Sequence, residues 1–284
     1  MNSVYSIDKF SVCVNASDFL YNQLREIVSS FCLSVDSPVY NLHVKSVSEI
    51  KIPSDSLSRG DCFYTQSDDL SFCLISELIR FEICLQEKEA VLEVCDLSGQ
   101  DSLSFILYAL KWYISFITIH EGGIPLHSSS VFACDRAFLF AGESGAGKST
   151  ICSILSSHPG GFRRGSDEFN LLFITDEGVK VFPTPYTSSA GDCQFFGGMD
   201  LKKLYIIKKA SYNCTHPLAF RNKYYNCLKN IYTKPASSYL AEKMFENVEI
   251  AACAVDCNEL YFANNNSLRK FLLSENGLNY ELQN

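Results

Sequence analysis

The chain has 284 residues, of which 47% are hydrophobic, so it is long enough to bury one large core or two smaller ones. The formal net charge of −8 does not favour nucleic acid or an anionic membrane as the main partner, because both attract proteins with an excess of Lys and Arg. Phosphate binding by this protein therefore has to depend on a local cluster of positive charge.

The first 97 residues are expected to form a β-rich domain. Apolar residues alternate within short runs that polar breaks separate, which is the pattern of strands in an antiparallel sheet. The runs are YSIDKFSVCV, VYNLHVKSV, DCFYTQ, DLSFCLIS, LIRFEICLQ and AVLEVCD. One helix is predicted near the start, in DFLYNQLREIVSSFCL, where Asp18 can act as the N-cap.

A long apolar helix is predicted from Leu103 to Ile119. The run is slightly short for a bilayer core, and Lys111 lies at its middle, where a charge is most costly in a membrane. We expect a helix buried in protein, with a membrane span as the alternative. The polar stretch DLSGQDS precedes it and favours a domain boundary, so the predicted domains are 1–100 and 101–284.

The second domain contains a complete phosphate-binding loop motif, GxxxxGK[ST], in the residues GESGAGKS. An apolar strand, AFLFA, precedes the loop, and a helix, STICSILSS, follows it with an N-terminus that attracts anions. Backbone N–H groups can face phosphate oxygens, Lys148 can reach the terminal phosphates, and the Ser149 hydroxyl can bind magnesium. The expected phosphate-binding residues are Gly142, Ser144, Gly145, Ala146, Gly147, Lys148, Ser149 and Thr150.

A hairpin is predicted to lead directly into this loop. The runs HSSSVFAC and AFLFAG are separated by Asp135 and Arg136, which indicates a tight turn between two strands. Most parallel-sheet nucleoside triphosphatases lack such a partner for the strand before the loop, so we expect an α/β fold with a mixed sheet. The hairpin also brings His127 within reach of the loop, although a lone histidine is usually structural.

Two acidic pairs follow the loop. Asp176 and Glu177 end the apolar run LLFITDE, like the second acidic motif of ATPases, but Gly178 and a strand-like VKVFP follow and favour a hairpin turn. Asp167 and Glu168 come just before a strand, where an acidic pair could reach the terminal phosphate. A solvated turn is the alternative for this second pair.

Basic residues gather between Asp200 and Lys234, where there are eight against one acid. Such runs are most often solvated faces, and an acidic substrate or a phosphate site is the alternative. The eight are Lys202, Lys203, Lys208, Lys209, Arg221, Lys223, Lys229 and Lys234.

The 13 cysteines are scattered, mostly in apolar runs, and no two have CxxC spacing. Together with an N-terminus, MNSVYSIDKF, that does not resemble a secretory leader, this pattern favours reduced, packed thiols in the cytoplasm.

The order LHSSSV, AFLFAGESGAGKST, GSDEFNLL and KVFPTPY resembles the catalytic domain of the HPr kinase/phosphorylase family, most closely its HPr-kinase-like members, which include lasso-peptide kinases. The loop architecture is also similar to that of ATP-dependent phosphoenolpyruvate carboxykinase. The resemblance covers about residues 119 to 277, with a weaker match in FENVEIAACAVDCNELYF. It implies a mixed-sheet P-loop kinase domain that uses ATP and Mg²⁺.

The resemblance also implies roles for individual residues. Lys148 would clamp phosphate, Asp167 would be the general base, and His127 would be a charge-stabilising neighbour. The implied metal ligands are Ser149, Asp167 and Glu168; the family usually has two aspartates, so the role of Glu168 is a departure from its pattern. The family's signature for phosphorolysis is not found in this sequence, which does not favour the reverse reaction.

We therefore expect a cytoplasmic kinase that transfers the γ-phosphate of ATP to a hydroxyl group of a peptide or protein serine. Phosphoryl transfer needs charge neutralisation, in-line positioning and an acid–base group, and the residues above supply candidates for each. The alternatives are a kinase of a small metabolite, such as an amino acid or organic acid, and a nucleotide-binding regulator without transfer activity.

Overall fold

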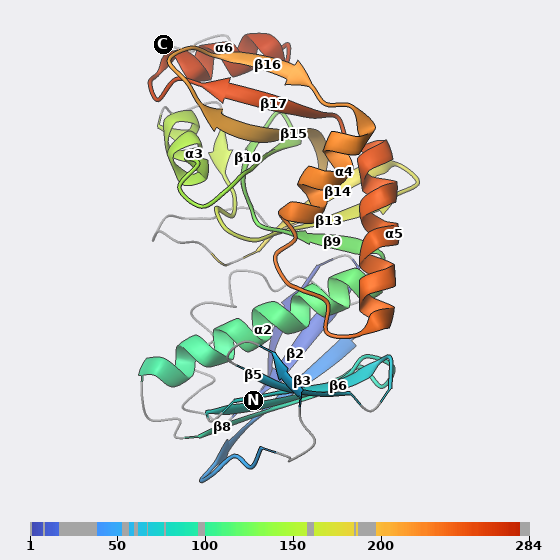
Figure 1. Ribbon diagram of the computed structural model, residues 1–284. Coiled ribbons are helices and arrows are strands. Elements are labelled where there is room, and N and C mark those ends of the chain that lie inside the picture. Colours follow the sequence, from blue (N-terminus) through green and yellow to red (C-terminus); the bar gives the residue numbers. More distant parts are fainter. Residues whose placement is uncertain are drawn as a thin grey trace. The chain divides into compact units, whose positions relative to one another are not determined.

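The computed structural model describes residues 2–7, 9–16, 39–52, 57–59, 62–66, 68–76, 78–95, 100–157, 162–184, 186 and 197–278. These residues fold into two compact units, one of residues 1–121 and 233–244 and the other of residues 122–232 and 245–284 (Figure 1). The helix predicted in DFLYNQLREIVSSFCL lies outside the described residues.

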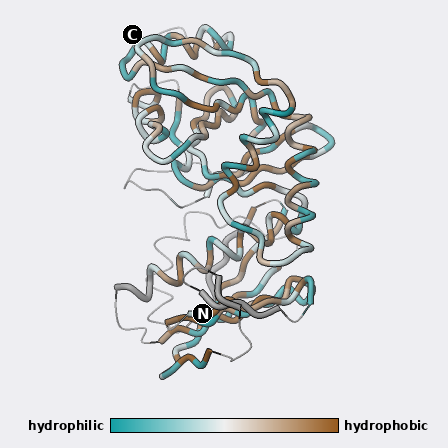
Figure 2. Tube along the Cα trace, viewed as in Figure 1, coloured by the Kyte–Doolittle hydropathy of each residue, from teal (hydrophilic) through white to brown (hydrophobic). Residues whose placement is uncertain are grey.

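The first unit is built on an eight-stranded sheet in the order β1-β2-β3-β8-β7-β6-β5-β4. Along β3 and β7 polar and apolar residues alternate, as expected when one face of a sheet is buried (Figure 2). The strands are β1 (Asn2–Ser6), β2 (Ser11–Asn15), β3 (Val39–Val47), β4 (Leu57–Arg59), β5 (Cys62–Gln66), β6 (Ser71–Ile75), β7 (Ile79–Cys84) and β8 (Glu89–Cys95).

The sheet of the first unit is mixed, so the prediction of an antiparallel sheet is wrong. The strand positions agree with the sequence pattern, but β3 pairs in parallel with both β2 and β8, whereas β6, β7 and β8 are antiparallel. Parallel neighbours need a long connection, and long segments do separate β2 from β3 and β3 from β8. Alternation of apolar residues predicts strands but carries no information on their direction.

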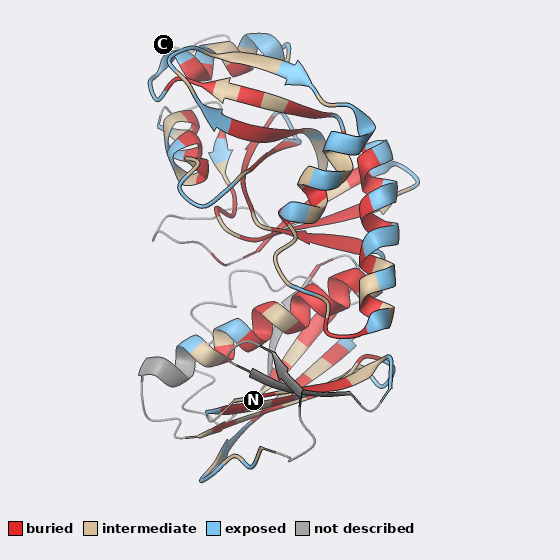
Figure 3. Cartoon of the chain, viewed as in Figure 1, coloured by how far each residue is buried: buried red, intermediate tan, exposed pale blue. Residues whose placement is uncertain are grey.

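The predicted apolar helix is present as α2 (Gln100–His120), and its residues from Ala109 to Ile119 are almost all buried (Figure 3). Tyr113 contacts the rings of Tyr40 and Phe81, and Phe116 contacts Phe72, so the helix packs on the N-terminal sheet. The structure thus places α2 with the first unit, whereas the sequence predicts a domain boundary before this helix. Among the described helices, none is both long and apolar enough to span a bilayer.

The second unit contains a curled, half-barrel-like sheet of nine strands, in which β12-β10-β11-β15-β14-β13-β9 are successive neighbours and β17 joins β15 to β16. Its strands are β9 (Gly123–Leu126), β10 (Ser128–Ala133), β11 (Arg136–Ala141), β12 (Arg163–Arg164), β13 (Asn170–Thr175), β14 (Gly178–Pro183), β15 (Met199–Lys209), β16 (Cys214–Pro217) and β17 (Cys257–Phe262). The helices α3 (Lys148–Ser156), α4 (Phe220–Lys229) and α6 (Ser267–Glu275) belong to this unit, whereas α5 (Ser238–Ala254) begins in the first unit and ends in the second. The mixed α/β fold predicted for this part is confirmed.

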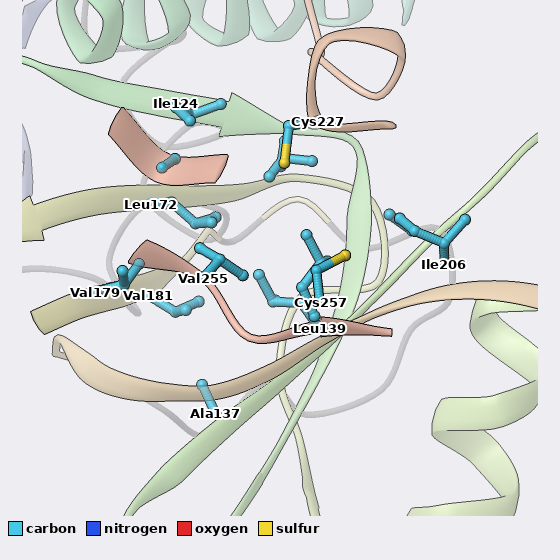
Figure 4. Close-up of a cluster of buried hydrophobic side chains, with 14 of the residues drawn as sticks. Ile124, Ala137, Leu139, Leu172, Val179, Val181, Ile206, Cys227, Val255 and Cys257 are labelled. Carbon is cyan, nitrogen blue, oxygen red and sulfur yellow. The ribbon is translucent and has the colours of Figure 1, made fainter. Parts of the chain in front are cut away.

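The strand before the loop, β11, is buried on both faces. Leu139 points into a core shared with α4 and α5, of which Figure 4 shows the side chains, and Phe138 and Phe140 point into a second core under α3 and α6. Strand β15 alternates in the same way, with Ile206 in the first core and Tyr205 in the second. Because both faces of these strands are buried, consecutive residues along them are apolar, and the polar–apolar alternation of a half-buried strand is missing.

Both hairpins predicted in this unit are present. In the β10–β11 hairpin the turn residues are Cys134 and Asp135, one position earlier than predicted, and both have positive φ, as the common two-residue turn requires. In the β13–β14 hairpin the exposed turn contains Asp176 and Glu177.

Candidate functional site

Three sequence-predicted elements meet at one end of the nine-stranded sheet. β10 is antiparallel to β11 with Ser128 opposite Ala141, so His127 lies at the end where the glycine-rich loop begins. β13 starts at the same end, because Asn170 pairs with Leu126 of β9. Sheet register therefore brings together the loop, His127 and the residues that precede β13.

The glycine-rich loop connects β11 to α3 as predicted. Gly147 caps α3 with φ of 106°, and a Cβ atom added to it would lie 2.8 Å from Cζ of Phe262. Both the backbone conformation and this contact require glycine. The loop therefore presents the N-terminus of a helix, where backbone N–H groups can bind an anion.

The ammonium group of Lys148 is held by the loop itself. Its Nζ donates to the carbonyl oxygens of Gly142 and Glu143 at 2.8 and 3.3 Å, and the residue is only 8% exposed. Burial lowers the pKa of Lys148, and the negative charge of Glu168 opposes this shift. Lys148 is thus a buried cation in the loop with a carboxylate in its electrostatic field.

Two other residues of the motif, Ser149 and Glu143, differ in whether their side chains have a hydrogen-bond partner. The Ser149 hydroxyl makes no hydrogen bond to any residue that the structure describes, so it is available as a ligand. Glu143 accepts a 2.7 Å hydrogen bond from Nζ of Lys229, at the end of α4, and this ion pair lowers the pKa of the Glu143 carboxyl.

The acidic segment before β13 is fixed to β10 by serine hydroxyls. Ser129 Oγ donates to the carbonyl oxygen of Asp167 at 2.8 Å, and Ser130 Oγ donates to that of Ser166 at 3.1 Å. Gly165 allows this close approach, because an added Cβ would lie 2.3 Å from Ser130 Oγ. Ser129 and Ser130 of the polar run HSSSV therefore hold the acidic segment against β10. The hydropathy of the sequence did not indicate this role.

Within that segment the two carboxylates have different environments. The Asp167 side chain is fully buried, and its Oδ2 accepts a 2.9 Å hydrogen bond from Nη2 of Arg164. Glu168 is only partly buried, and its charge acts on Lys148. The charge of Glu168 thus affects the pKa of Lys148, whereas the charge of Asp167 affects the pKa of Cys152 in α3.

His127 lies at the junction between β9 and β10. Its backbone N–H donates to the Asn230 carbonyl at 2.8 Å, and its ring is 6.4 Å from that of Tyr232. The Tyr232 ring in turn contacts Phe169, next to Glu168, at 4.6 Å between centroids. An aromatic layer therefore connects His127 to the acidic segment.

The other acidic pair lies elsewhere. Asp176 and Glu177 come after Thr175, the last residue of β13. At the usual rise per residue of a strand, that end of β13 is about 17 Å from Asn170. The hairpin interpretation is confirmed, and these two acids are not at the loop.

Two residues near the loop, Arg164 and Phe262, were not singled out from the sequence, and a third, Lys209, was noticed only as a member of the basic segment. Arg164 pairs with Asp167, Phe262 packs on Gly147, and Lys209 has its Cε 3.6 Å from a Cβ added to Gly147. Lys209 and Lys229 do lie in the basic segment noticed in the sequence. That signal could have located them only with knowledge of where β15 and α4 end.

These residues fit a nucleotide phosphate with magnesium. No group of three or more His, Cys, Asp or Glu side chains in the described part of the chain could hold a metal by itself. Mg²⁺ usually keeps several waters and takes one or two protein oxygens together with substrate phosphates, so the Ser149 hydroxyl and the Glu168 carboxylate are the candidates for holding it. Comparison with known proteins adds no further assignment, since neither a family model nor a curated protein matches the chain.

Proposed function

We propose that this protein is a kinase of the HPr kinase type that transfers the γ-phosphate of ATP to a hydroxyl group. The observation that carries the proposal is the conjunction at one sheet end of a complete GxxxxGKS loop, a buried Lys148 and the partly buried Glu168. A strand, a glycine-rich loop and a helix N-terminus in this order are the known requirements for holding nucleotide phosphates. The hairpin partner of β11 supports the HPr kinase type over parallel-sheet ATPases.

Lys148 would exchange its bonds to loop carbonyls for phosphate oxygens. The two carbonyl acceptors hold the ammonium near the loop before nucleotide binds, which reduces the ordering needed when phosphate arrives. Mg²⁺, bound by Ser149 and the phosphates, would neutralise charge that develops during transfer.

Glu168 is our choice for the residue that accepts the proton of the acceptor hydroxyl. In the transfer step the bond from the γ-phosphorus to the ADP oxygen breaks, a bond to the acceptor oxygen forms, and the hydroxyl proton moves to the carboxylate. Asp167, predicted for this step from the family pattern, is fully buried against Arg164. We assign Asp167 to positioning the acidic segment and Arg164.

A peptide or protein serine remains the proposed acceptor, with a small metabolite as the alternative. The segment from 200 to 234 has an excess of positive charge, and its Lys229 lies against the loop, where it pairs with Glu143. An acidic acceptor sequence would complement it electrostatically.

Magnesium-dependent binding tests the nucleotide part of this proposal. We expect calorimetry to show tight binding of ATP with Mg²⁺ and weaker binding when a chelator removes the metal, because Ser149 and phosphate oxygens share it. Equal affinity in both conditions would remove the metal from the mechanism.

A further inference from the structure

Strand β15 ends in two consecutive lysines that point to opposite faces of the sheet. Side chains alternate along a strand, and Ile206 lies in the core under α4 and α5, whereas Ile207 lies in the core under α3. Lys208 therefore continues the face of Ile206, and Lys209 continues the face of Ile207, where the glycine-rich loop enters α3.

Lys208 is occupied by neighbours on its own face. Its Nζ lies 2.6 Å from a carboxylate oxygen of Glu259 and 5.4 Å from the centre of the Tyr261 ring. The ion pair with Glu259 raises the pKa of Lys208. Lys208 is thus bound to β17 on the side of the sheet away from the loop.

Lys209 is directed toward the loop. Its Cε lies 3.6 Å from the position of a Cβ on Gly147, so its ammonium, one bond farther, is next to the residue that caps α3. Lys209 is exposed, and it makes no ion pair or hydrogen bond with any side chain that the structure describes. Ile207, two residues earlier on the same face, already packs under Gly142 at the start of the loop.

Other cations around the loop have partners. Lys229 is paired with Glu143, Arg164 with Asp167, and Lys148 with loop carbonyls. The phosphates of ATP carry several negative charges, and their transfer depends on cations placed around them. Lys148 and one Mg²⁺ would meet part of that requirement, and an unpaired lysine beside the loop could add to it.

We propose that Lys209 is a second phosphate-binding residue of this site, and that its ammonium contacts the phosphate chain of a nucleotide at the N-terminus of α3. The inference rests on the proposed function. It predicts a preference for nucleotides with two or three phosphates over a monophosphate, because only the longer chains reach both Lys148 and Lys209.

The test is calorimetric titration of ATP and AMP into wild-type protein, Lys209→Gln, Lys209→Arg and Lys208→Gln, with Mg²⁺ and ionic strength fixed. We expect Lys209→Gln to weaken ATP binding about tenfold or more, as the loss of a charge-assisted hydrogen bond does, and to change AMP binding much less. Lys209→Arg should keep most of the ATP affinity. Lys208→Gln, the matched control one residue away, should bind ATP like the wild type.

Salt dependence supplies a second readout that a merely structural role would not change. Removing a cation that contacts phosphate should reduce the loss of ATP affinity with rising salt. If Lys209→Gln binds ATP within about twofold of wild type, or if Lys208→Gln loses as much affinity, the assignment of Lys209 is wrong. A wild-type protein that binds ATP through Lys148 would in that case leave the proposed function standing, whereas a wild-type protein that binds no ATP would overturn both.

Discussion

Replacing Lys148 with alanine should reduce phosphoryl transfer by at least about 10²- to 10³-fold, because the substitution removes the cation that the loop holds for the phosphates. The fold should remain, since the ammonium bonds only to loop carbonyls and the strand and helix on either side are packed by other residues. Initial rates of phosphate incorporation and the thermal unfolding midpoint measure the two effects.

A matched control for this variant is Lys208→Ala. It removes the same charge from a neighbouring element, but Lys208 belongs to the opposite face of β15. If the purified Lys148→Ala protein transfers phosphate at the wild-type rate, the loop is not the transfer site.

The acidic positions should separate into three behaviours. Glu168→Gln should leave nucleotide bound but lower transfer by about 10²- to 10⁴-fold, the usual cost of losing acid–base catalysis. Asp167→Asn should lower transfer through loss of position and also lower the free energy of unfolding by up to about 3 kcal/mol, because Arg164 loses a buried charged partner. Asp176→Asn, in an exposed hairpin turn, should change neither.

Transfer rate, ATP affinity and denaturant midpoint, measured on all three variants, decide between the roles. If Asp167→Asn loses transfer at an unchanged midpoint while Glu168→Gln remains active, Asp167 is the base, as the family pattern implies. Loss of activity in Asp176→Asn with activity retained in the other two would contradict both the site and the resemblance.

Local sequence patterns predicted much of this fold. Short-range preferences predicted the two hairpin turns, which contain Asp135 and Asp176, and the order of strand, glycine-rich loop and helix. Each of these features is present. The long apolar run predicted the helix α2. Its length and the charge of Lys111 at its middle favoured burial in protein over a membrane span.

Long-range arrangement was not predictable in the same way. Parallel pairing of β3 with β2 and β8 depends on connections whose path no local pattern specifies. The contact of Lys209 with the loop depends on β15 lying parallel to β11, which places the ends of both strands at the same edge. Asp167 and Glu168 precede β13 as the sequence predicts, but only the structure shows that Arg164 pairs with Asp167 and that the charge of Glu168 raises the pKa of Lys148.

The most direct test of the central claim is a transfer assay with the wild-type protein, ATP labelled in its γ-phosphate, Mg²⁺, and a mixture of serine-containing peptides and free amino acids. Mass spectrometry of the products identifies the acceptor. We predict that labelled phosphate appears on a hydroxyl group, that a serine in a peptide is preferred over the free amino acids, and that Lys148→Ala abolishes the signal. If ATP binds but only labelled inorganic phosphate is released from it, or if no label leaves ATP with any acceptor, the protein is not the kinase proposed here.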